Sequence, residues 1–469
     1  MSEPSCPGCV QRDALIATLQ QRIEELERQV RDLQQRLGLT ASNSSLPPSA
    51  NPPGAPPPVV KRPTGRKSGG QPGHQGHRRL RLPPERVQHV IPLIPTRCEA
   101  CHAPLPQQAS AADPEPTWHQ FAELPKVQAV VTEFQGHART CTCCGHLTRE
   151  AIPQEIRAHA FGPRLAATLS YLSGSQYVSQ RGLEDVAEVV FGVPLSLGSV
   201  TSLQDQMGEA LEPAHQGIAD EVRAAPVKNA DETGWKQAGG KRWLWAAVTT
   251  TAALFVIHAR RGAEGLKALL GESVRGVIGS DRWSAYGLIP LLRRQICWAH
   301  LRRDFQAMID AGKDLLIGAQ LLDWSDKLFD RWHEVRRGKP SRKAFAAWIE
   351  AECRPRVKTW LELGTESRCA KTAGMCAEIL KVEEALWTFA RVRGVEPTNN
   401  AAERALRPAV IKRKRSFGCH SAAGCRFTER LLSVTATLRL RGRPVLDYLV
   451  EALVAHRHGL PAPALPTAL

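Results

Sequence analysis

A proline-rich segment divides the chain into parts that must fold separately. Between residues 46 and 63, the sequence "LPPSANPPGAPPPVVKRP" contains eight prolines. Proline fixes φ and has no backbone N–H to donate, so this run cannot form helix or sheet and is expected to be an extended linker. We therefore expect a short N-terminal element, residues 1–45, joined by a linker and arm, residues 46–90, to a larger folded part.

The N-terminal element carries apolar residues in alternating steps of three and four. This spacing is typical of a heptad seam, and β-branched residues mostly at a with leucine at d favour a parallel dimer. The seam positions are Ile16, Leu19, Ile23, Leu26, Val30, Leu33 and Leu37. A single amphipathic helix packed on its own domain is the alternative. The pattern predicts a coiled coil that forms a homodimer or a higher oligomer.

The charge of the chain indicates its partners. It has 62 Lys and Arg against 46 Asp and Glu, a net charge of +16 over 469 residues. Such an excess favours a polyanion such as nucleic acid. No apolar run reaches the roughly 18 residues that span a bilayer, and the N-terminus has no apolar signal core. We expect a cytoplasmic protein with no membrane partner.

A basic arm follows the prolines. The stretch "KRPTGRKSGGQPGHQGHRRLRLP" has no acidic residue and is rich in glycine. Its cations are expected to contact DNA phosphates, with a solvated basic tail as the alternative. The expected contacts are Lys61, Arg62, Arg66, Lys67, Arg78 and Arg79.

The cysteines predict a zinc-binding module over residues 91–158. Thirteen cysteines in a cytosolic chain indicate metal ligation or buried thiols rather than disulfides. "CEAC" supplies Cys98 and Cys101, and "CTCCGH" supplies Cys141, Cys143 and Cys144. Glycine directly after Cys144 suits a tight turn, which favours that residue over Cys143. Cys98, Cys101, Cys141 and Cys144 are therefore expected to hold a structural Zn²⁺.

Residues 159–225 are expected to be helical. Within them, "RGLEDVAEVVFGVPLSLGSVTSLQDQM" has the spacing of a helix, a turn that contains glycine, and a second helix opened by Ser196 or Ser199. This is helix-turn-helix spacing, with residues 197–207 as the candidate recognition helix for DNA. A plain helical hairpin is the alternative.

After residue 225 the pattern changes to α/β. Strands are expected at residues 225–231, 241–250, 253–260, 275–281 and 293–300, with a helix at 262–271. Asp231 would end the first of these strands and Asp281 the fourth. If those strands are neighbours, the two carboxylates meet at one sheet edge, where a divalent cation such as Mg²⁺ or Mn²⁺ relieves their repulsion.

A third carboxylate lies far along the chain. "EPTNNAAERALRPAVIKRKRSFG" places Glu403 on a helix opened by Asn399 or Asn400. A helix facing the strand ends can bring that acid to the aspartate pair, as two-metal phosphoryl transfer requires. Its basic residues are then expected to face DNA phosphates. They are Arg404, Arg407, Lys412, Arg413, Lys414 and Arg415.

Several motifs together resemble the IS66 family of bacterial insertion-sequence transposases. The matching pieces are "DETGW", "SDRWSAY", "CWAHLRRDF" and "TNNAAERALRP", with "SNSSLPPS", "GGQPGHQGH" and the paired CxxC upstream. The resemblance extends from the coil to about residue 440. It implies a DDE transposase with an RNase H-like core, in which Asp231, Asp281 and Glu403 hold two Mg²⁺. Glu232 would then lie behind the ligands or face solvent.

The resemblance also implies how the core is divided. A helical insertion, residues 305–395, would separate core segments 226–304 and 396–445, with a C-terminal tail at 446–469. His300 and Arg303 would lie near the metals, where they can contact the scissile phosphate. A histidine packed in the core is the alternative for His300.

The expected activity is DNA transposition. The protein would bind the double-stranded terminal repeats of its element, nick them with Mg²⁺-activated water and join the 3′-hydroxyls to target DNA. It would act at the bacterial nucleoid, with accessory proteins encoded by the same element as further partners. The alternatives are a catalytically silent DNA-binding regulator and an RNase H-like nuclease without strand transfer.

Overall fold

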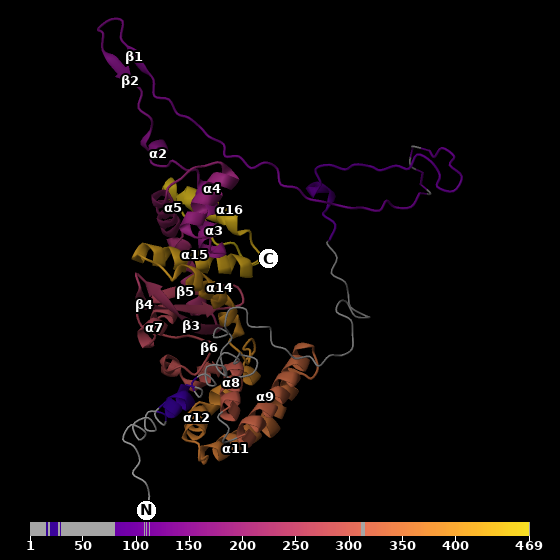
Figure 1. Cartoon of the computed structure of the whole chain (residues 1–469), viewed down its shortest axis with the longest axis vertical. Helices are drawn as coiled ribbons and strands as arrows, with labels where there is room; N and C mark the ends of the chain where they lie inside the picture. The colour runs from indigo at the N-terminus through magenta and orange to yellow at the C-terminus, as the bar shows by residue number, and fades with distance from the viewer. Residues whose placement is uncertain are drawn as a thin grey trace, which may run out of the picture. The chain divides into compact units, whose positions relative to one another are not determined.

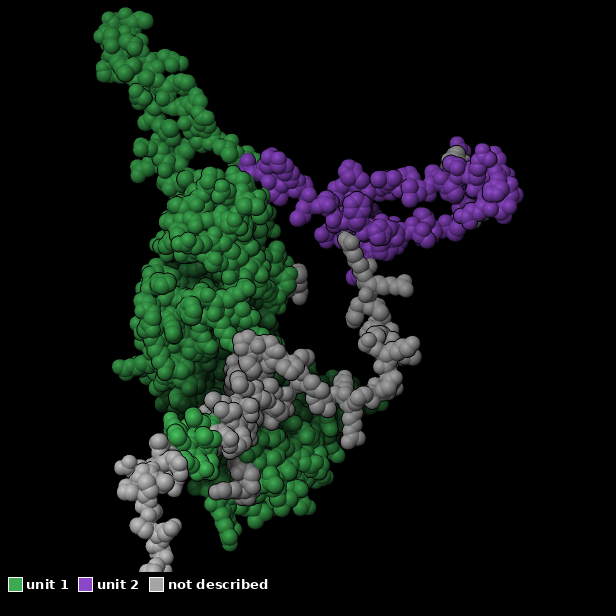
Figure 2. Space-filling model, in the orientation of Figure 1, with its two compact units in different colours: residues 1–59, 130–469 green, residues 60–129 purple. Residues whose placement is uncertain are grey.

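A computed structural model describes residues 16, 19–26, 29, 80–106, 108, 110, 111, 113–310 and 315–468. The chain forms two compact units, residues 1–59 with 130–469 and residues 60–129 (Figure 2). The larger unit is a mixed α/β structure. Among the described residues, no helix combines the length and apolar character needed to cross a bilayer.

The elements of the larger unit follow one another along the chain as a small hairpin, five helices, a sheet and a long helical region. The hairpin and the helices before the sheet are β1 (Ala138–Thr140), β2 (Leu147–Arg149), α2 (Gln154–Arg157), α3 (Pro163–Gln176), α4 (Gln180–Phe191), α5 (Leu197–Ala210) and α6 (Glu212–Ala224). The sheet region comprises β3 (Val227–Gln237), β4 (Gly240–Val248), β5 (Ala253–His258), α7 (Ala263–Leu270), β6 (Val277–Ser280) and β7 (Arg294–Ile296). The helices after it are α8 (Trp298–Asp310), α9 (Leu315–Arg336), α10 (Arg342–Trp348), α11 (Arg354–Thr365), α12 (Ala370–Leu380), α13 (Thr388–Arg391), α14 (Asn400–Ser416), α15 (Ala422–Leu440) and α16 (Val445–Arg457). The predicted helices between residues 160 and 225 are thus confirmed.

The five strands form one sheet in the order β5-β4-β3-β6-β7 (Figure 1). β3, β4 and β5 pair antiparallel, whereas β3, β6 and β7 pair parallel. The first and fourth predicted strands are therefore neighbours, as the metal-site hypothesis required.

The prediction that Asp231 ends its strand is wrong. β3 continues to Gln237 because its antiparallel ladder with β4 runs from Asn229 to the tight turn. Ala238 and Gly239 make that turn with φ of 48° and 78°, the left-handed pair that a two-residue hairpin needs. Asp231 consequently lies inside a long strand.

The sheet is covered on both faces. Along β4, Trp245 and Ala247 join a core with the α3–α6 helices, α15 and α16, whereas Leu244 and Ala246 pack with α14 on the other face. This alternation follows from the two-residue period of a strand. The helices predicted as a separate DNA-binding region thus share a hydrophobic core with the sheet, because their apolar faces are buried against it.

The predicted C-terminal tail contains a helix that belongs to this core. α16 buries Tyr448, Leu449 and Leu453 against the helices that precede the sheet. The segment predicted as the C-terminal tail therefore contributes a helix to the core.

The long helical region from α8 to α13 has a core of its own. Trp332, Phe345 and Phe389 pack there ring to ring, with centroid separations of 5.3–5.9 Å. The expected strand at residues 293–300 is too long, because the chain turns into α8 at Trp298, whose backbone N–H donates to the carbonyl of Pro397 at 2.9 Å. His300 therefore lies on a helix.

Two predicted features fall mostly outside the described residues. Ile16, Leu19, Ile23 and Leu26 are helical and exposed, as unpaired seam residues would be. The remaining seam positions and the whole basic arm, Lys61 to Arg79, lie outside the described part of the chain. Pairing of the coil and phosphate contact by the arm stay predictions.

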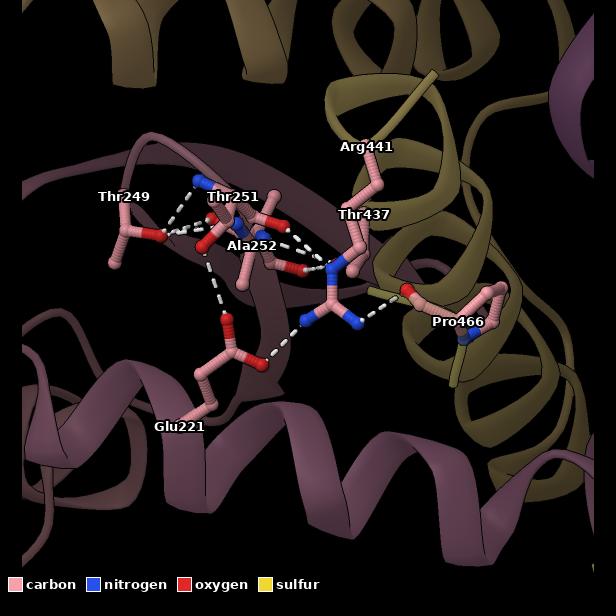
Figure 3. A network of polar contacts seen from close by, with 8 residues as sticks. Glu221, Thr249, Thr251, Ala252, Thr437, Arg441 and Pro466 are labelled. Atoms are coloured by element: carbon pink, nitrogen blue, oxygen red, sulfur yellow. Dashed lines mark hydrogen bonds and ion pairs between the residues drawn. The ribbon is translucent and has the colours of Figure 1, made fainter. Parts of the chain in front are cut away.

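A polar network fastens the C-terminal segment to the sheet (Figure 3). The Arg441 guanidinium at the end of α15 donates to the carbonyls of Thr251 and Pro466, at 3.0 and 2.9 Å, and pairs with the carboxylate of Glu221 on α6. The Thr251 hydroxyl donates to the same carboxylate at 3.0 Å. One buried arginine thus joins α6, the β4–β5 turn, α15 and the C-terminal segment.

We expect Arg441→Ala to lower the free energy of unfolding by about 2–3 kcal/mol, because several acceptors lose a charged donor. Urea denaturation would measure the change. Arg443→Ala is the matched control, since Arg443 is only partly buried and its side chain donates to one carbonyl, that of Thr467. Equal effects of the two substitutions would contradict the role given to Arg441.

A second prediction concerns Glu429 on α15, which accepts a hydrogen bond from the backbone N–H of Ile257 on β5. Burial raises the pKa of Glu429 from 4.5 to about 7. The contribution of Glu429 to the free energy of unfolding is therefore complete below pH 4.5, where its side chain is protonated, and it is lost as the pH rises to 7. We expect Glu429→Gln to become more stable than wild type across this window, by up to about 3 kcal/mol. Urea denaturation at several pH values tests this; a constant difference would refute it.

Candidate functional site

The parallel pairing of β3 and β6 aligns the two aspartates. Val227 pairs with Val277 and Asn229 with Gly279. Extending this register by two residues sets Asp231 opposite Asp281, just past the end of β6. The predicted meeting of these acids at one edge of the parallel pairing follows directly from the register.

Glu403 reaches the same place from α14, which packs on β3 and β4. Burial and the neighbouring carboxylates of Glu232, Asp281 and Glu403 raise the pKa of Asp231 well above its usual range. Burial also raises the pKa of Asp281, although the N–H of Trp283 donates to its carboxylate at 2.9 Å. The three predicted acids are therefore in electrostatic contact.

Glu232 has a different environment from Asp231. Its side chain is buried, accepting from Arg261 Nε at 2.8 Å and from the Tyr286 hydroxyl at 2.9 Å. The Arg261 guanidinium lies over the rings of Trp283 and Trp243, 3.8 and 4.8 Å from their centroids. Glu232 does not face solvent, and it has a built-in counter-ion. Sequence reasoning missed Arg261, which carries no motif, and missed Tyr286 within the quoted "SDRWSAY".

His300 and Arg303, on the first turns of α8, both lie beside Glu403. His300 Nδ1 is 3.5 Å and Arg303 Nη2 is 3.9 Å from Glu403 Oε1. Burial, then Arg303 and Arg282, lower the pKa of His300 to about 3. The imidazole is therefore neutral near pH 7, and Arg303 supplies the positive charge at this carboxylate.

The cations of α14 divide into two groups. Arg404, Arg407, Lys414 and Arg415 are exposed and available to an outside partner. Two others point into the fold. Lys412 Nζ donates to the Thr428 hydroxyl at 3.2 Å, and Arg413 donates to Thr233 and Gly234 of β3. The sequence pattern did not predict this division, because nothing local distinguishes the exposed cations of this segment from those that point into the fold.

The carboxylates fit divalent cations by their chemistry. Asp231, Asp281 and Glu403 offer hard oxygen ligands whose mutual repulsion a cation would relieve. Glu403 Oε1 is buried, with no hydrogen-bond partner among the described residues. Within the described part of the chain, Cys297, His300 and Glu403 form a group of three possible metal ligands whose ligand atoms lie within 4.8 Å of one another.

Each predicted zinc knuckle forms a tight turn within its own unit. In the smaller unit, Cys98 precedes a turn that ends at His102, with φ of 59°; in the larger unit, the turn after Cys141 ends at Gly145, with φ of 72°. In each turn, backbone N–H groups lower the pKa of the first thiol. The N–H of Cys143 donates to Cys141 Sγ at 3.4 Å, and the choice between the Cys143 and Cys144 thiols stays a prediction. Zinc binding stays a prediction.

The helix-turn-helix candidate consists of α4 and α5. The Ser196 hydroxyl accepts from the N–H of Ser199 at 3.2 Å and so opens α5, as predicted. α5 buries Val200, Leu203 and Met207 and contains no lysine or arginine. Base contact by this helix would therefore depend on neutral polar groups, and it stays a prediction.

Comparison with known proteins gave two family matches and two relatives. A model described as "Transposase IS66 family" matches residues 158–426, and one described as "Family of unknown function (DUF6444)" matches residues 6–80. The chain is 26% identical to "Uncharacterized protein y4qI" of Sinorhizobium fredii (strain NBRC 101917 / NGR234), over 81% of this chain and 74% of that protein. It is 24% identical to "Uncharacterized protein y4hP" of the same strain, over 78% and 71% respectively.

The crowding of negative charge predicts that the site destabilises the fold when no cation is bound. We expect Asp231→Asn to raise the free energy of unfolding in EDTA at pH 7.5 by on the order of 1 kcal/mol, because a buried charge is removed. Millimolar Mg²⁺ should stabilise the wild type and so reduce the difference in unfolding free energy between the variant and the wild type. Denaturation with EDTA and with Mg²⁺ measures both effects. A variant less stable than wild type in EDTA would contradict this account.

Proposed function

The chain belongs to the Transposase IS66 family, and we propose that it is a DNA transposase that binds the terminal repeats of its insertion sequence. In this proposal it cleaves those ends in a Mg²⁺-dependent reaction and transfers the freed 3′-hydroxyls to target DNA. Asp231, Asp281 and Glu403 are the catalytic acids, carried by a core of the RNase H-like type.

One observation carries the proposal. The β3–β6 register aligns Asp231 with Asp281, and α14 adds Glu403 in electrostatic contact with Asp231, within the region that matches the family model. The charged groups that shift the pKa of Asp231 are all carboxylates, and such crowding of acids is typical of catalytic metal sites.

The triad would hold Mg²⁺, or Mn²⁺, through its carboxylate oxygens. Divalent cations bound there supply positive charge that favours deprotonation of the attacking hydroxyl and stabilises the leaving oxygen. Glu232 holds Arg261 and Tyr286 on the other side of β3 and thereby fixes the strand that carries Asp231.

The surrounding cations would position DNA. Arg303 lies beside Glu403, where it can contact the scissile phosphate. Arg407 follows Glu403 by four residues on α14, so it shares a side of that helix with the acid and can bind a neighbouring phosphate. Neutral His300 can donate or accept a hydrogen bond there but adds no charge.

The other segments would bind and pair DNA ends. The coil would join protomers so that two ends are handled together, and the basic arm and zinc module would contact phosphates. The α4–α5 pair would read bases. A cytoplasmic, nucleoid-associated location and accessory proteins from the same element complete the proposal.

Substitution of the triad tests the proposal. With a supercoiled plasmid that carries the element's ends, we expect Asp231→Asn, Asp281→Asn and Glu403→Gln each to lower Mg²⁺-dependent nicking at least about 100-fold, since several kcal/mol of charge stabilisation is lost. DNA binding in a mobility-shift assay should remain near wild type. Asp447→Asn, on the surface of α16, is the matched control and should nick normally.

The outcomes separate the alternatives. Nicking that survives the Asp231→Asn substitution would refute the assignment of Asp231, Asp281 and Glu403 as the catalytic acids. Binding by wild type with no nicking, even when the element's other proteins are added, would favour a silent regulator. Nicking without joining of 3′-ends to target DNA would favour a nuclease of the same fold.

A further inference from the structure

Cys297 continues the row of polar residues at the edge of the sheet. β6 and β7 pair Ser280 with Ile296, and one further step of this register sets Cys297 opposite Asp281. The Cys297 carbonyl accepts from the N–H groups of His300 and Leu301, which begins α8. His300 therefore follows Cys297 by three residues on the first turn, and the two side chains lie on the same side.

Glu403 completes a compact set with these two residues. One ligand atom each from Cys297, His300 and Glu403 lie within 4.8 Å of one another. The backbone N–H of Asn399 donates to Cys297 Sγ at 3.3 Å and so ties the start of α14 to this thiol. Glu403 thus belongs to two ligand sets, with the aspartates on one side and a thiol and an imidazole on the other.

Two of the atoms in this set lack hydrogen bonds. His300 Nδ1 and Glu403 Oε1 are buried and lie 3.5 Å apart, yet neither has a hydrogen-bond partner among the described residues. A buried polar atom left unpaired carries a free-energy cost. Arg303 contributes only a long contact, 3.9 Å from the same oxygen. A cation bound by these atoms would remove that cost.

The chemistry of the donors selects the kind of cation. Sulfur, imidazole nitrogen and one carboxylate oxygen suit Zn²⁺ or Co²⁺, whereas Mg²⁺ requires oxygen ligands. An imidazole nitrogen binds Zn²⁺ directly, and the thiol would release its proton to solvent on binding. Three protein ligands leave one coordination position open, unlike the four-cysteine site predicted near the N-terminus.

We propose that Cys297, His300 and Glu403 form a second divalent-cation site, selective for Zn²⁺-like ions, that shares Glu403 with the aspartate pair. An ion bound there holds Glu403 against α8 and withdraws it from Asp231 and Asp281. Zn²⁺ is then an inhibitor that competes with Mg²⁺ for one carboxylate. The inhibition rests on the proposed function, whereas binding of the ion does not.

Cobalt spectroscopy of the full chain tests the site itself. We expect Cys297→Ala to bind about one Co²⁺ fewer per chain than wild type and to lose the matching thiolate-to-cobalt absorption. The cysteines of the two CxxC knuckles contribute equally to both proteins, so the difference spectrum isolates this site. Cys353→Ala removes another fully buried thiol, within the α8–α13 core, and should bind cobalt like wild type.

His300→Asn provides an independent variant if Cys297→Ala does not fold. It should also bind about one Co²⁺ fewer per chain than wild type. Unchanged cobalt stoichiometry in a folded Cys297→Ala or His300→Asn protein would overturn the site. In plasmid nicking with Mg²⁺, the Zn²⁺ concentration for half-inhibition should rise at least about tenfold in Cys297→Ala and stay unchanged in Cys353→Ala. Cobalt binding without any nicking would place the failure in the proposed function and leave the site intact.

Discussion

The unequal pairing of β3 determines where the acidic site can form. On one side β3 pairs with β4 as far as Gln237, but on the other its pairing with β6 ends at Asn229. Beyond that point, no described strand pairs with the second edge of β3, and the end of β3 instead forms a backbone bridge with Cys419. Asp231 and Asp281 lie at this opening, where carboxylates can be reached by α14 and by a ligand from outside the sheet.

The two-residue period of β3 separates the adjacent acids Asp231 and Glu232. Asp231 is in electrostatic contact with Glu403 of α14, whereas Glu232 is held by Arg261 and Tyr286. Neighbouring residues of a strand point to opposite faces, so the same dipeptide supplies one acid to each side of the sheet. A shift of the register by one residue would exchange their environments.

The sequence predicted the strands, the helices and the acids better than it predicted their surroundings. Asp231 and Asp281 could be paired because each follows a short β-prone run. The length of β3 could not be predicted, because it depends on a turn at Ala238 that lacks the usual Asn-Gly or Asp-Gly signal. The inward orientation of Arg413 depends on tertiary contacts with β3, which no local pattern encodes. The proximity of Cys297 to Glu403 has the same origin.

The helical region between β7 and α14 helps to position Glu403, which is 122 residues beyond Asp281 in the chain. The Gln295 side chain on β7 donates to the carbonyl of Leu386 and accepts from the N–H of Phe389, at 3.0 and 2.7 Å, so the end of this region is fastened to the sheet. A few residues later, Asn399 bonds to Cys297 and, through its side chain, to the carbonyl of Ala230 at 3.4 Å.

These contacts fix the start of α14 between β3 and the β7–α8 corner. Glu403 lies one turn further along α14. The contacts of Asn399 therefore determine how far Glu403 lies from the aspartates and from Cys297 and His300. The insertion is therefore part of the site's framework, although none of the predicted catalytic acids lies within it.

The two adjacent acids of β3 differ in how their charge is balanced. Glu232 has Arg261 as a dedicated counter-ion, and that guanidinium is held between Trp243 and Trp283. The charged groups that shift the pKa of Asp231, by contrast, are all carboxylates. The chain carries a net charge of +16, so cations are abundant, yet they lie on α14 or behind β3 rather than on Asp231. In the proposed function, this arrangement would leave Asp231 to a divalent ion and the exposed Arg404 and Arg407 of α14 to DNA phosphates.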